Sequence, residues 1–355
     1  MNREKAMLPL EGKRILVTGG TGSLGHALVR RLLTGEIGQP ARIVVFSRDE
    51  AKQHYMRLHY KKRRMATEEI IYHNSQEILS FRIGDVRDYP AVAAAVKEAD
   101  VVFSAAALKQ VPTCEYFPGE AVATNVLGAQ NIVRAIRENG ASVRTVVGIS
   151  TDKACKPINV MGMTKALQER ILLEANLECQ GTRLLCVRYG NVLSSRGSVV
   201  PLFREQIKQG GPITITLKEM TRFLLTLDQA VDTILAAVRS ALPGETYVPR
   251  VPSARIVDIA RVMMDGKDIP FTYTGIRPGE KIHEILVSEE ESYRTLERDG
   301  YYVICPILPE IRQAELTKPA LSGEFSSSTG PLDLGRLRKL LQPMISGIEE
   351  DEGFA

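Results

Sequence analysis

The amino-acid sequence predicts an α/β fold, in which a doubly wound parallel sheet is followed by a smaller and irregular C-terminal lobe. Short runs of β-branched residues alternate with amphipathic helical stretches through the first half of the chain, as in parallel strands joined by crossover helices. After Asn191 the pattern loosens into turns rich in proline and glycine. The chain has 355 residues, against ~150 for a typical domain, so it has room for both parts.

The expected strands are six short runs that share β-branched residues. They cover residues 14–18, 42–46, 79–83, 101–105, 145–150 and 184–188. Helical periodicity is found between them at 24–33, 91–99 and 121–137, and the turn signal Asn139-Gly140 closes the last stretch. This order predicts a doubly wound topology.

The boundary between the two parts is expected to be discontinuous. A helical stretch at 226–239 and a strand-like run at 245–248 interrupt the irregular region and can return to the sheet. We therefore assign residues 1–190 and 226–250 to the sheet domain, and 191–225 and 251–340 to a substrate-binding lobe. The acidic end, 341–355, is expected to be a solvated tail.

Composition and charge exclude several classes of protein. Lys and Arg number 46 against 42 Asp and Glu, and the surplus of +4 is too small to drive nucleic-acid or membrane binding. The 5 cysteines lie far apart and the 5 histidines lack ligand spacing, so neither disulfides nor a metal site is expected. The N-terminus has no signal-peptide core, and no apolar run reaches the ~18 residues of a membrane helix, which predicts a cytoplasmic protein.

A glycine-rich turn follows the first expected strand directly and leads into a helix. Gly19, Gly22 and Gly25 stand at three-residue spacing. Such a turn lets the backbone approach a pyrophosphate, and the free amides of the helix N-terminus favour an anion. The turn therefore predicts a Rossmann-like dinucleotide site. Its expected contacts are Gly19, Thr21, Gly22, Ser23, Leu24 and Gly25.

The end of the second strand indicates which dinucleotide is bound. An NAD site places a carboxylate there for the ribose hydroxyl, whereas this chain has Ser47 and Arg48. A guanidinium suits the 2'-phosphate of NADP, which is the predicted cofactor. The alternative is an ordinary surface arginine, since Asp49 is only one position further on. After the third strand, Asp85 and Val86 are expected to meet the adenine.

Three further blocks, 105–112, 150–154 and 275–281, carry a resemblance to a known family together with the glycine turn. The chain resembles the extended short-chain dehydrogenase/reductases that act on nucleotide sugars. More narrowly, it is similar to the inverting UDP-N-acetylglucosamine 4,6-dehydratases of capsule and flagellin-sugar biosynthesis, from Lys13 to about residue 290. The runs 189–192 and 220–223 take part in the likeness.

The resemblance implies a lyase that regenerates its NADP within each turnover. Hydride leaves C4 of the sugar, a base removes the C5 proton, the C6 hydroxyl departs as water, and hydride returns to C6 with inversion at C5. Lys153 is the expected base if burial and a cationic neighbour lower its pKa, and Asp152 is the expected acid if its pocket is dry. Both must lie beyond the strand end, before a helix that Pro157 is expected to open.

One position departs from the superfamily pattern Y-x-x-x-K. Met161 stands where tyrosine is expected, four residues before Lys165 and on the same helix face. A branch of the same dehydratase group carries methionine there. A thioether has no proton to exchange, so the O4 proton must pass through Lys165, Thr151 or a water held between them.

The resemblance also implies the remaining contacts and the assembly. Ala105, Ala107, Lys109 and Lys165 are expected at the cofactor. The UDP-sugar is expected to meet Lys109, Asn191, Val199, Thr216, Arg222 and Arg277, the two arginines at the diphosphate. Relatives commonly form hexamers, so a homo-oligomer is expected. Two other functions remain open: a UDP-N-acetylhexosamine 4- or 5-epimerase on the same fold, and a non-catalytic NADP-binding sensor.

Overall fold

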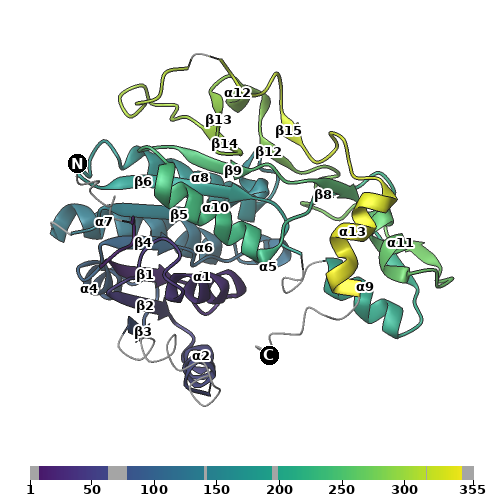
Figure 1. Ribbon diagram of the computed structural model, residues 1–355, viewed down its shortest axis with the longest axis horizontal. Coiled ribbons are helices and arrows are strands. Elements are labelled where there is room, and N and C mark those ends of the chain that lie inside the picture. The colour runs from purple at the N-terminus through teal and green to yellow at the C-terminus, as the bar shows by residue number, and fades with distance from the viewer. Residues whose placement is uncertain (1–7, 63–77, 140–141, 194–198, 317, 346–355) are drawn as a thin grey trace, which may run out of the picture.

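A nine-stranded sheet runs through the centre of the computed structural model, which describes residues 8–62, 78–139, 142–193, 199–316 and 318–345 (Figure 1). Its order is β13-β14-β9-β6-β5-β4-β1-β2-β3. The first six strands along the chain are parallel to one another: β1 (Arg14–Thr18), β2 (Arg42–Ser47), β3 (Leu79–Ile83), β4 (Val101–Ser104), β5 (Thr145–Thr151) and β6 (Arg183–Tyr189). The predicted doubly wound α/β fold is confirmed, and the six strands lie within one residue of their expected ends.

Helices cover both faces of the sheet because its strands are apolar on both sides. On one face, α1 (Ser23–Leu33), α2 (Glu50–Lys62) and α10 (Leu227–Ser240) share a core with β1, β2 and β5. On the other face, α4 (Tyr89–Val96), α7 (Gly128–Asn139) and α8 (Val160–Glu174) pack against the same strands. Because the strands are parallel, the loops that follow them meet at the carboxyl edge of the sheet, where open α/β sheets bind ligands.

The helix expected at 121–137 is divided into three pieces. After α5 (Val111–Tyr116), the chain forms α6 (Pro118–Ala121), a π-helical turn at Val122–Leu127 and then α7. The side chain of Asn125, 1% exposed, lies in that turn and bonds to both backbone polar groups of Leu108. The π-helical turn is therefore accompanied by hydrogen bonds between Asn125 and Leu108. Helical periodicity in the sequence does not reveal such contacts, so it did not predict the interruption of the helix. Gly140 lies outside the described residues.

The chain returns to the sheet after the first irregular segment. Thr226 caps α10, and β9 (Thr246–Pro249) then pairs parallel to β6. The sheet continues through β14 (Tyr301–Ile304) and β13 (Thr295–Arg298), both antiparallel to their neighbours. Assigning 295–304 to the smaller lobe was therefore wrong, because these residues satisfy the backbone groups that β9 would otherwise leave unpaired.

The smaller lobe has its own apolar core. It contains α9 (Val199–Lys208), β7 (Ile213–Ile215), β8 (Thr221–Phe223), β10 (Ser253–Arg255), α11 (Ile256–Met264), β11 (Phe271–Tyr273) and α13 (Leu334–Ile345). Figure 1 shows α9, α11 and α13 gathered beside the sheet, at the side away from β3. Leu337 and Leu341 of α13 are fully buried. The expected acidic tail therefore does not begin at 341, and residues 346–355 lie outside the described part.

Three short elements connect this lobe to the sheet. β12 (Ile285–Val287) pairs antiparallel with β15 (Phe325–Ser326), and α12 (Glu289–Ser292) follows β12 directly.

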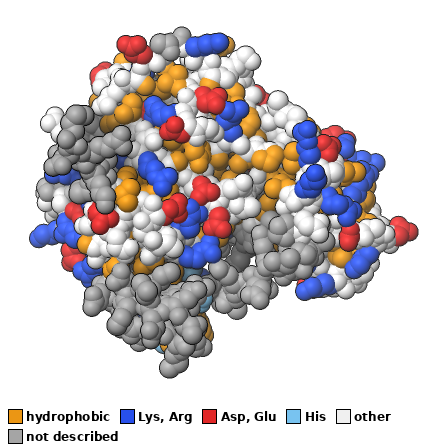
Figure 2. All heavy atoms as spheres, viewed as in Figure 1, with side chains coloured by type: hydrophobic (Ala, Val, Ile, Leu, Met, Phe, Trp, Pro, Cys, Tyr) orange, Lys and Arg blue, Asp and Glu red, His pale blue; other side chains and the backbone are white. Residues whose placement is uncertain are grey.

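On the face shown in Figure 2, Lys and Arg side chains are interspersed with Asp and Glu rather than gathered by sign. None of the helices in the described ranges is both long and apolar enough to cross a membrane.

Candidate active site

The glycine turn after β1 has the space that a pyrophosphate needs. Gly19 has φ +66°, and a Cβ there would lie 2.7 Å from the Ala106 backbone, so the β1 and β4 loops touch. A Cβ on Gly25 would lie 2.4 Å from Gly20, so α1 packs directly on the turn. A Cβ on Gly22, in contrast, would meet only the Gly19 carbonyl oxygen, at 3.4 Å. Gly22 precedes α1, whose N-terminus has no side-chain cap, and the residues present fit a dinucleotide.

The residues after β2 leave a guanidinium at the expected ribose position. Ser47 Oγ lies 2.9 Å from Thr21 Oγ1, which ties the β2 end to the glycine turn. The Asp49 carboxylate accepts a hydrogen bond from the Lys52 backbone N–H at 2.9 Å and pairs with Lys52 Nζ at 2.7 Å. Asp49 is therefore engaged at the start of α2. The Arg48 side chain is 57% exposed and lies 3.6 Å from Asp85.

The loop after β4 is held on two sides. Thr18 Oγ1 accepts hydrogen bonds from the backbone N–H groups of Ala105 and Ala106, at 3.1 and 3.3 Å. Further along, Asn125 bonds to the Leu108 backbone and donates to Thr164 Oγ1 of α8 at 2.9 Å. Ala107 lies between these anchors and is half-buried, and Lys109 follows them on the exposed side.

Asp152 and Lys153 lie immediately beyond β5, in a short 3-10 turn that spans Asp152–Ala154. The Thr151 hydroxyl accepts from the Lys153 backbone N–H and donates to Asp152 Oδ1 at 2.9 Å. The turn frees both side chains from the alternation of a strand, so they can point into one site. Asp152 is 0% exposed, and its Oδ2 has no hydrogen-bond partner among the described residues.

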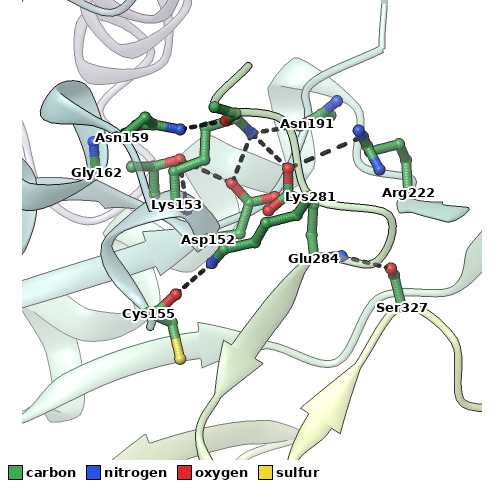
Figure 3. Close-up of polar contacts among 12 residues, drawn as sticks. Asp152, Lys153, Cys155, Asn159, Gly162, Asn191, Arg222, Lys281, Glu284 and Ser327 are labelled. Atoms are coloured by element: carbon green, nitrogen blue, oxygen red, sulfur yellow. Dashed lines mark hydrogen bonds and ion pairs between the residues drawn. The ribbon is translucent and has the colours of Figure 1, made fainter. Parts of the chain in front are cut away.

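Lys153 is surrounded by three oxygen atoms from different parts of the chain (Figure 3). Its Nζ lies 3.1 Å from Asp152 Oδ1, 3.1 Å from Glu284 Oε1 and 3.2 Å from Asn191 Oδ1. Glu284 is 2% exposed, and its Oε2 is also buried without a hydrogen-bond partner in the described part. The cluster therefore presents two carboxylates around one ammonium group.

Burial and neighbouring charge determine the proton positions in this cluster. Burial raises the pKa of Asp152, and the charge of Glu284 raises it further, against the opposing effect of Lys153. This is the direction that an acid role for Asp152 requires. Burial lowers the pKa of Lys153, but Asp152 and Glu284 together outweigh it, so the pKa is raised. The lowered lysine pKa that was set as the condition for a base role is therefore not found in this arrangement, because the neighbours of Lys153 include two anions.

The 275–281 block approaches the same site through two contacts. Asn159 Nδ2 donates to the Gly279 carbonyl oxygen at 2.7 Å, and Lys281 Nζ donates to the Cys155 carbonyl oxygen (Figure 3). Asn159 also caps α8, since its Oδ1 accepts from the Gly162 backbone N–H at 2.8 Å. The helix therefore begins at Val160 rather than at Pro157, because the side-chain cap sets its first turn.

Lys165 of α8 is buried, and its amine contacts the part of β5 that extends beyond the end of β4. Its Nζ donates to the Ile149 carbonyl oxygen and to Gln168 Oε1. Since β4 ends opposite Gly148, Ile149 is the first residue of β5 without a β4 partner. Burial lowers the pKa of Lys165 to about 8. Both forms of this amine are therefore accessible near neutral pH.

Met161 lies on α8 in a small apolar cluster. It is 5% exposed and packs with Cys114 and Ala121, which come from α5 and α6. A thioether has no proton to exchange, so Met161 contributes packing where the superfamily pattern has a phenol.

The residues expected to contact the substrate differ in burial and in hydrogen bonding. Arg222 is buried, donates to the backbone oxygens of Thr221 and Ile282 at 2.7 and 3.1 Å, and lies 3.9 Å from Glu284. Arg277 is exposed, and its side chain makes no hydrogen bond or ion pair within the described ranges, although its carbonyl oxygen accepts from the Glu280 N–H at 3.1 Å. In the smaller lobe, Val199 packs at the edge of the core and Thr216 accepts a backbone hydrogen bond at the 275–281 block.

Sequence reasoning missed three residues that organise the site. Glu284 lies three positions beyond the 275–281 block, and a carboxylate so close to that block was an available signal. Asn159 precedes a helix and is a good N-cap residue, which also could have been recognised. Asn125 gave no signal, since it looks like one polar residue on an amphipathic helix.

A buried ionic network supports the strands beneath the site. Arg188 of β6 contacts Glu169 of α8 at 2.6 Å and Glu291 of α12 at 2.7 Å. The Ser150 hydroxyl donates to Glu169 at 2.5 Å. The network connects β5, β6 and α8 behind Asp152 and Lys153.

The sheet and the glycine turn define the class: a Rossmann-like α/β protein with the short-chain dehydrogenase/reductase-like fold that solved nucleotide-sugar epimerases and dehydratases also have. The chain belongs to the family described as "Polysaccharide biosynthesis protein", which matches residues 15–306.

Individual relatives agree with this family. A protein of Rickettsia akari named UDP-glucose 4-epimerase is 42% identical over 340 residues, which are 93% of this chain and 95% of that protein. The structure of Pen from Bacillus thuringiensis is 33% identical with a TM-score of 0.83, over 94% of this chain and 98% of that chain. A dTDP-glucose 4,6-dehydratase from Streptomyces venezuelae, with NAD bound, shares the fold at 20% identity and a TM-score of 0.62, over 76% of this chain and 86% of that chain.

Proposed function

We propose that this protein is an NADP-dependent dehydratase that converts UDP-N-acetylglucosamine into a UDP-4-keto-6-deoxy-N-acetylhexosamine with inversion at C5. One observation carries the proposal: the buried Asp152 and the half-buried Lys153 form an acid–base pair with Nζ and Oδ1 3.1 Å apart. Epimerisation at C4 needs hydride transfer and one proton exchange at O4. Elimination of water across C5 and C6 needs an additional base and an additional acid, and this pair supplies both.

The glycine turn and Arg48 would hold the cofactor. NADP, when bound, supplies the hydride acceptor for C4 and the hydride donor for C6. The bare surface of Gly22 and the uncapped N-terminus of α1 suit the pyrophosphate, and the exposed Arg48 guanidinium suits the 2'-phosphate. The Asp49 carboxylate is engaged by Lys52 rather than left free for the ribose hydroxyl, which supports NADP over NAD.

The proton steps follow from the contacts of Lys153. The resting ammonium passes a proton to Asp152 Oδ1 across 3.1 Å, which leaves an amine beside a carboxylic acid. The amine takes the C5 proton, and Asp152 gives its proton to the departing C6 oxygen, which leaves as water. The hydride that bound NADPH would return to C6, together with a proton taken from solvent on the other face of C5, then gives the inverted sugar.

Two residues of this chain are the candidates for the O4 proton. Lys165 has a pKa of about 8, which lets its neutral amine accept a proton. Thr151 donates to Asp152 Oδ1 at 2.9 Å, and on this route the O4 proton would protonate that carboxylate while Lys153 releases its own proton to solvent. Thr151→Val and Lys165→Met separate the two routes, because the larger loss of C4 oxidation identifies the residue that carries the proton.

The decisive experiment is incubation of the protein and NADP with UDP-N-acetylglucosamine, followed by mass spectrometry and proton NMR of the product. We expect a product lighter by one water, with a C6 methyl signal. Lys153→Met should lose incorporation of solvent deuterium at C5 by ~100-fold to 10,000-fold while NADP still binds. Asp152→Asn is the matched variant, which should retain exchange but slow water loss. A product of unchanged mass would refute the dehydratase.

A UDP-hexose 4-epimerase is the second candidate. It is favoured by the Rickettsia akari relative, which is named UDP-glucose 4-epimerase and is 42% identical. Incubation with UDP-glucose tests it, since an epimerase yields the C4 epimer of the same mass. In that case Lys153→Met would retain C4 oxidation, because no C5 proton is moved.

A further inference from the structure

We propose that Glu284 is a positioning residue of the acid–base pair: its carboxylate holds the Lys153 ammonium between itself and Asp152 and so determines the pH range in which the pair works. The inference rests on the proposed dehydratase chemistry for its kinetic consequence. Nothing in the sequence pattern that indicated Asp152 and Lys153 required a third charged partner.

The distances support this role. Glu284 Oε1 and Asp152 Oδ1 each lie 3.1 Å from Lys153 Nζ, so the ammonium is paired equally with two carboxylates. Glu284 is 2% exposed, and water therefore screens the interaction little. A fully exposed ion pair would stabilise the ammonium very little, whereas the two carboxylates that contact Lys153 are both buried.

The backbone around Glu284 is anchored so that its side chain has a fixed origin. The Glu284 N–H donates to Ser327 Oγ at 2.9 Å, and the Ser327 N–H donates to the Glu284 carbonyl oxygen at 2.8 Å. Ser327 Oγ also bonds to Thr221 Oγ1 at 2.7 Å. Glu284 then leads directly into β12, which pairs with β15. Figure 3 shows Glu284 and Ser327 on these adjacent segments.

The other charged groups around the pair have settled partners. Arg222 Nε lies 3.9 Å from Glu284 Oε1 and its Nη1 is bonded to backbone oxygens, while Lys281 bonds to the Cys155 carbonyl oxygen. His283 Nδ1 is bonded to Thr221 at 2.8 Å. The titratable and charged groups that face the cluster from the surrounding segments are Asp152, Lys153, Arg222, Lys281, His283 and Glu284.

The charge of Glu284 acts in the same direction on both members of the pair. It favours the protonated form of Lys153 and the protonated form of Asp152, and its removal lowers both pKa values. The base must be deprotonated and the acid protonated, so kcat has a bell-shaped pH profile. Loss of the Glu284 charge should therefore move both limbs of the bell to lower pH, by about 1 unit or more.

The test compares the pH profiles of kcat for the wild type, Glu284→Asp and Glu284→Gln. Glutamine keeps the shape without the charge, whereas aspartate keeps the charge at a greater distance. We expect the limbs to move progressively in the order wild type, aspartate, glutamine. Glu290→Gln, a matched change at an exposed position of α12, should leave the profile in place. If the glutamine variant does not fold, the smaller shift in the aspartate variant still tests the inference. Coincident profiles for the folded Glu284 variants and the wild type would overturn it.

A second measurement does not depend on turnover. The pH dependence of Lys153 acylation by acetic anhydride, read by peptide mass spectrometry, reports the proton on this amine directly. Its midpoint should fall in Glu284→Gln and stay in Glu290→Gln; an unchanged midpoint would refute the role of Glu284. If the wild type dehydrates no UDP-sugar but the midpoint still falls, the proposed function is overturned and the assignment of Glu284 is retained.

Discussion

Gly22→Ala offers a test that separates cofactor binding from folding. Gly22 has φ −80° and ψ 167°, which any residue adopts, and an added Cβ would meet only the Gly19 carbonyl oxygen at 3.4 Å. The substitution lowers the conformational entropy of the unfolded chain, which stabilises the folded protein by roughly 0.4 to 1 kcal/mol. Alanine caps a helix less well than glycine, which acts in the opposite direction, so the free energy of unfolding should change little. The Cβ would, however, lie where the pyrophosphate must approach the turn.

The expected loss is in cofactor affinity. A charge-assisted hydrogen bond to phosphate contributes about 1.5 to 3 kcal/mol, which corresponds to roughly ten-fold to over a hundred-fold in the dissociation constant. Gly25→Ala is the matched control, because its Cβ would lie 2.4 Å from Gly20 within the protein itself. That overpacking should cost about 1 to 3 kcal/mol of stability.

The assay combines calorimetric titration with NADP and chemical unfolding in the absence of cofactor. We expect Gly22→Ala to unfold like the wild type and to bind NADP at least ten-fold more weakly. Wild-type NADP affinity in Gly22→Ala would refute the placement of the pyrophosphate at this turn. Lost stability in Gly22→Ala equal to that of Gly25→Ala would refute the packing argument.

Four further substitutions test other parts of the structure. Arg48→Ala should weaken NADP binding roughly ten-fold to over a hundred-fold while NAD binding stays unchanged; equal NADP affinity, measured by titration, would remove Arg48 from the site. Met161→Leu should retain most single-turnover C4 oxidation because it conserves packing, whereas Lys165→Met should lose nearly all of it; equal loss in two folded proteins would show that the sulfur takes part. Because the Lys165 pKa of about 8 lies below its ordinary value of 10.5, the unfolded state binds more protons between these pH values and stability should rise with pH across them. Lys165→Met should flatten that rise by about 3 kcal/mol in urea unfolding, and an identical slope would contradict the burial argument. Arg188→Met should cost about 3 to 5 kcal/mol because it leaves the buried carboxylates of Glu169 and Glu291 without their cation; wild-type stability would contradict it.

The strands and the glycine turn could be predicted because their signals are local. A β-branched run such as Arg42–Ser47 between turn signals indicates a buried strand wherever it packs. The turn after β1 is recognisable from glycine spacing, since the requirement for φ +66° at Gly19 and for close packing at Gly25 is set by neighbouring backbone. The right-handed crossovers of parallel strands limit the orders that such a sheet can adopt.

The partners of Lys153 were decided by tertiary structure alone. Asn191 comes from the loop after β6, and Glu284 is fixed by its bonds to Ser327 in a segment that sequence patterns left irregular. The pKa of a buried lysine depends on the sum of the charges around it, and that sum is known only when distant segments are placed. The sequence alone therefore determined the sheet and the glycine turn, and it predicted the Asp152–Lys153 pair. Only the tertiary structure decided that a second carboxylate completes the pair and keeps its lysine charged.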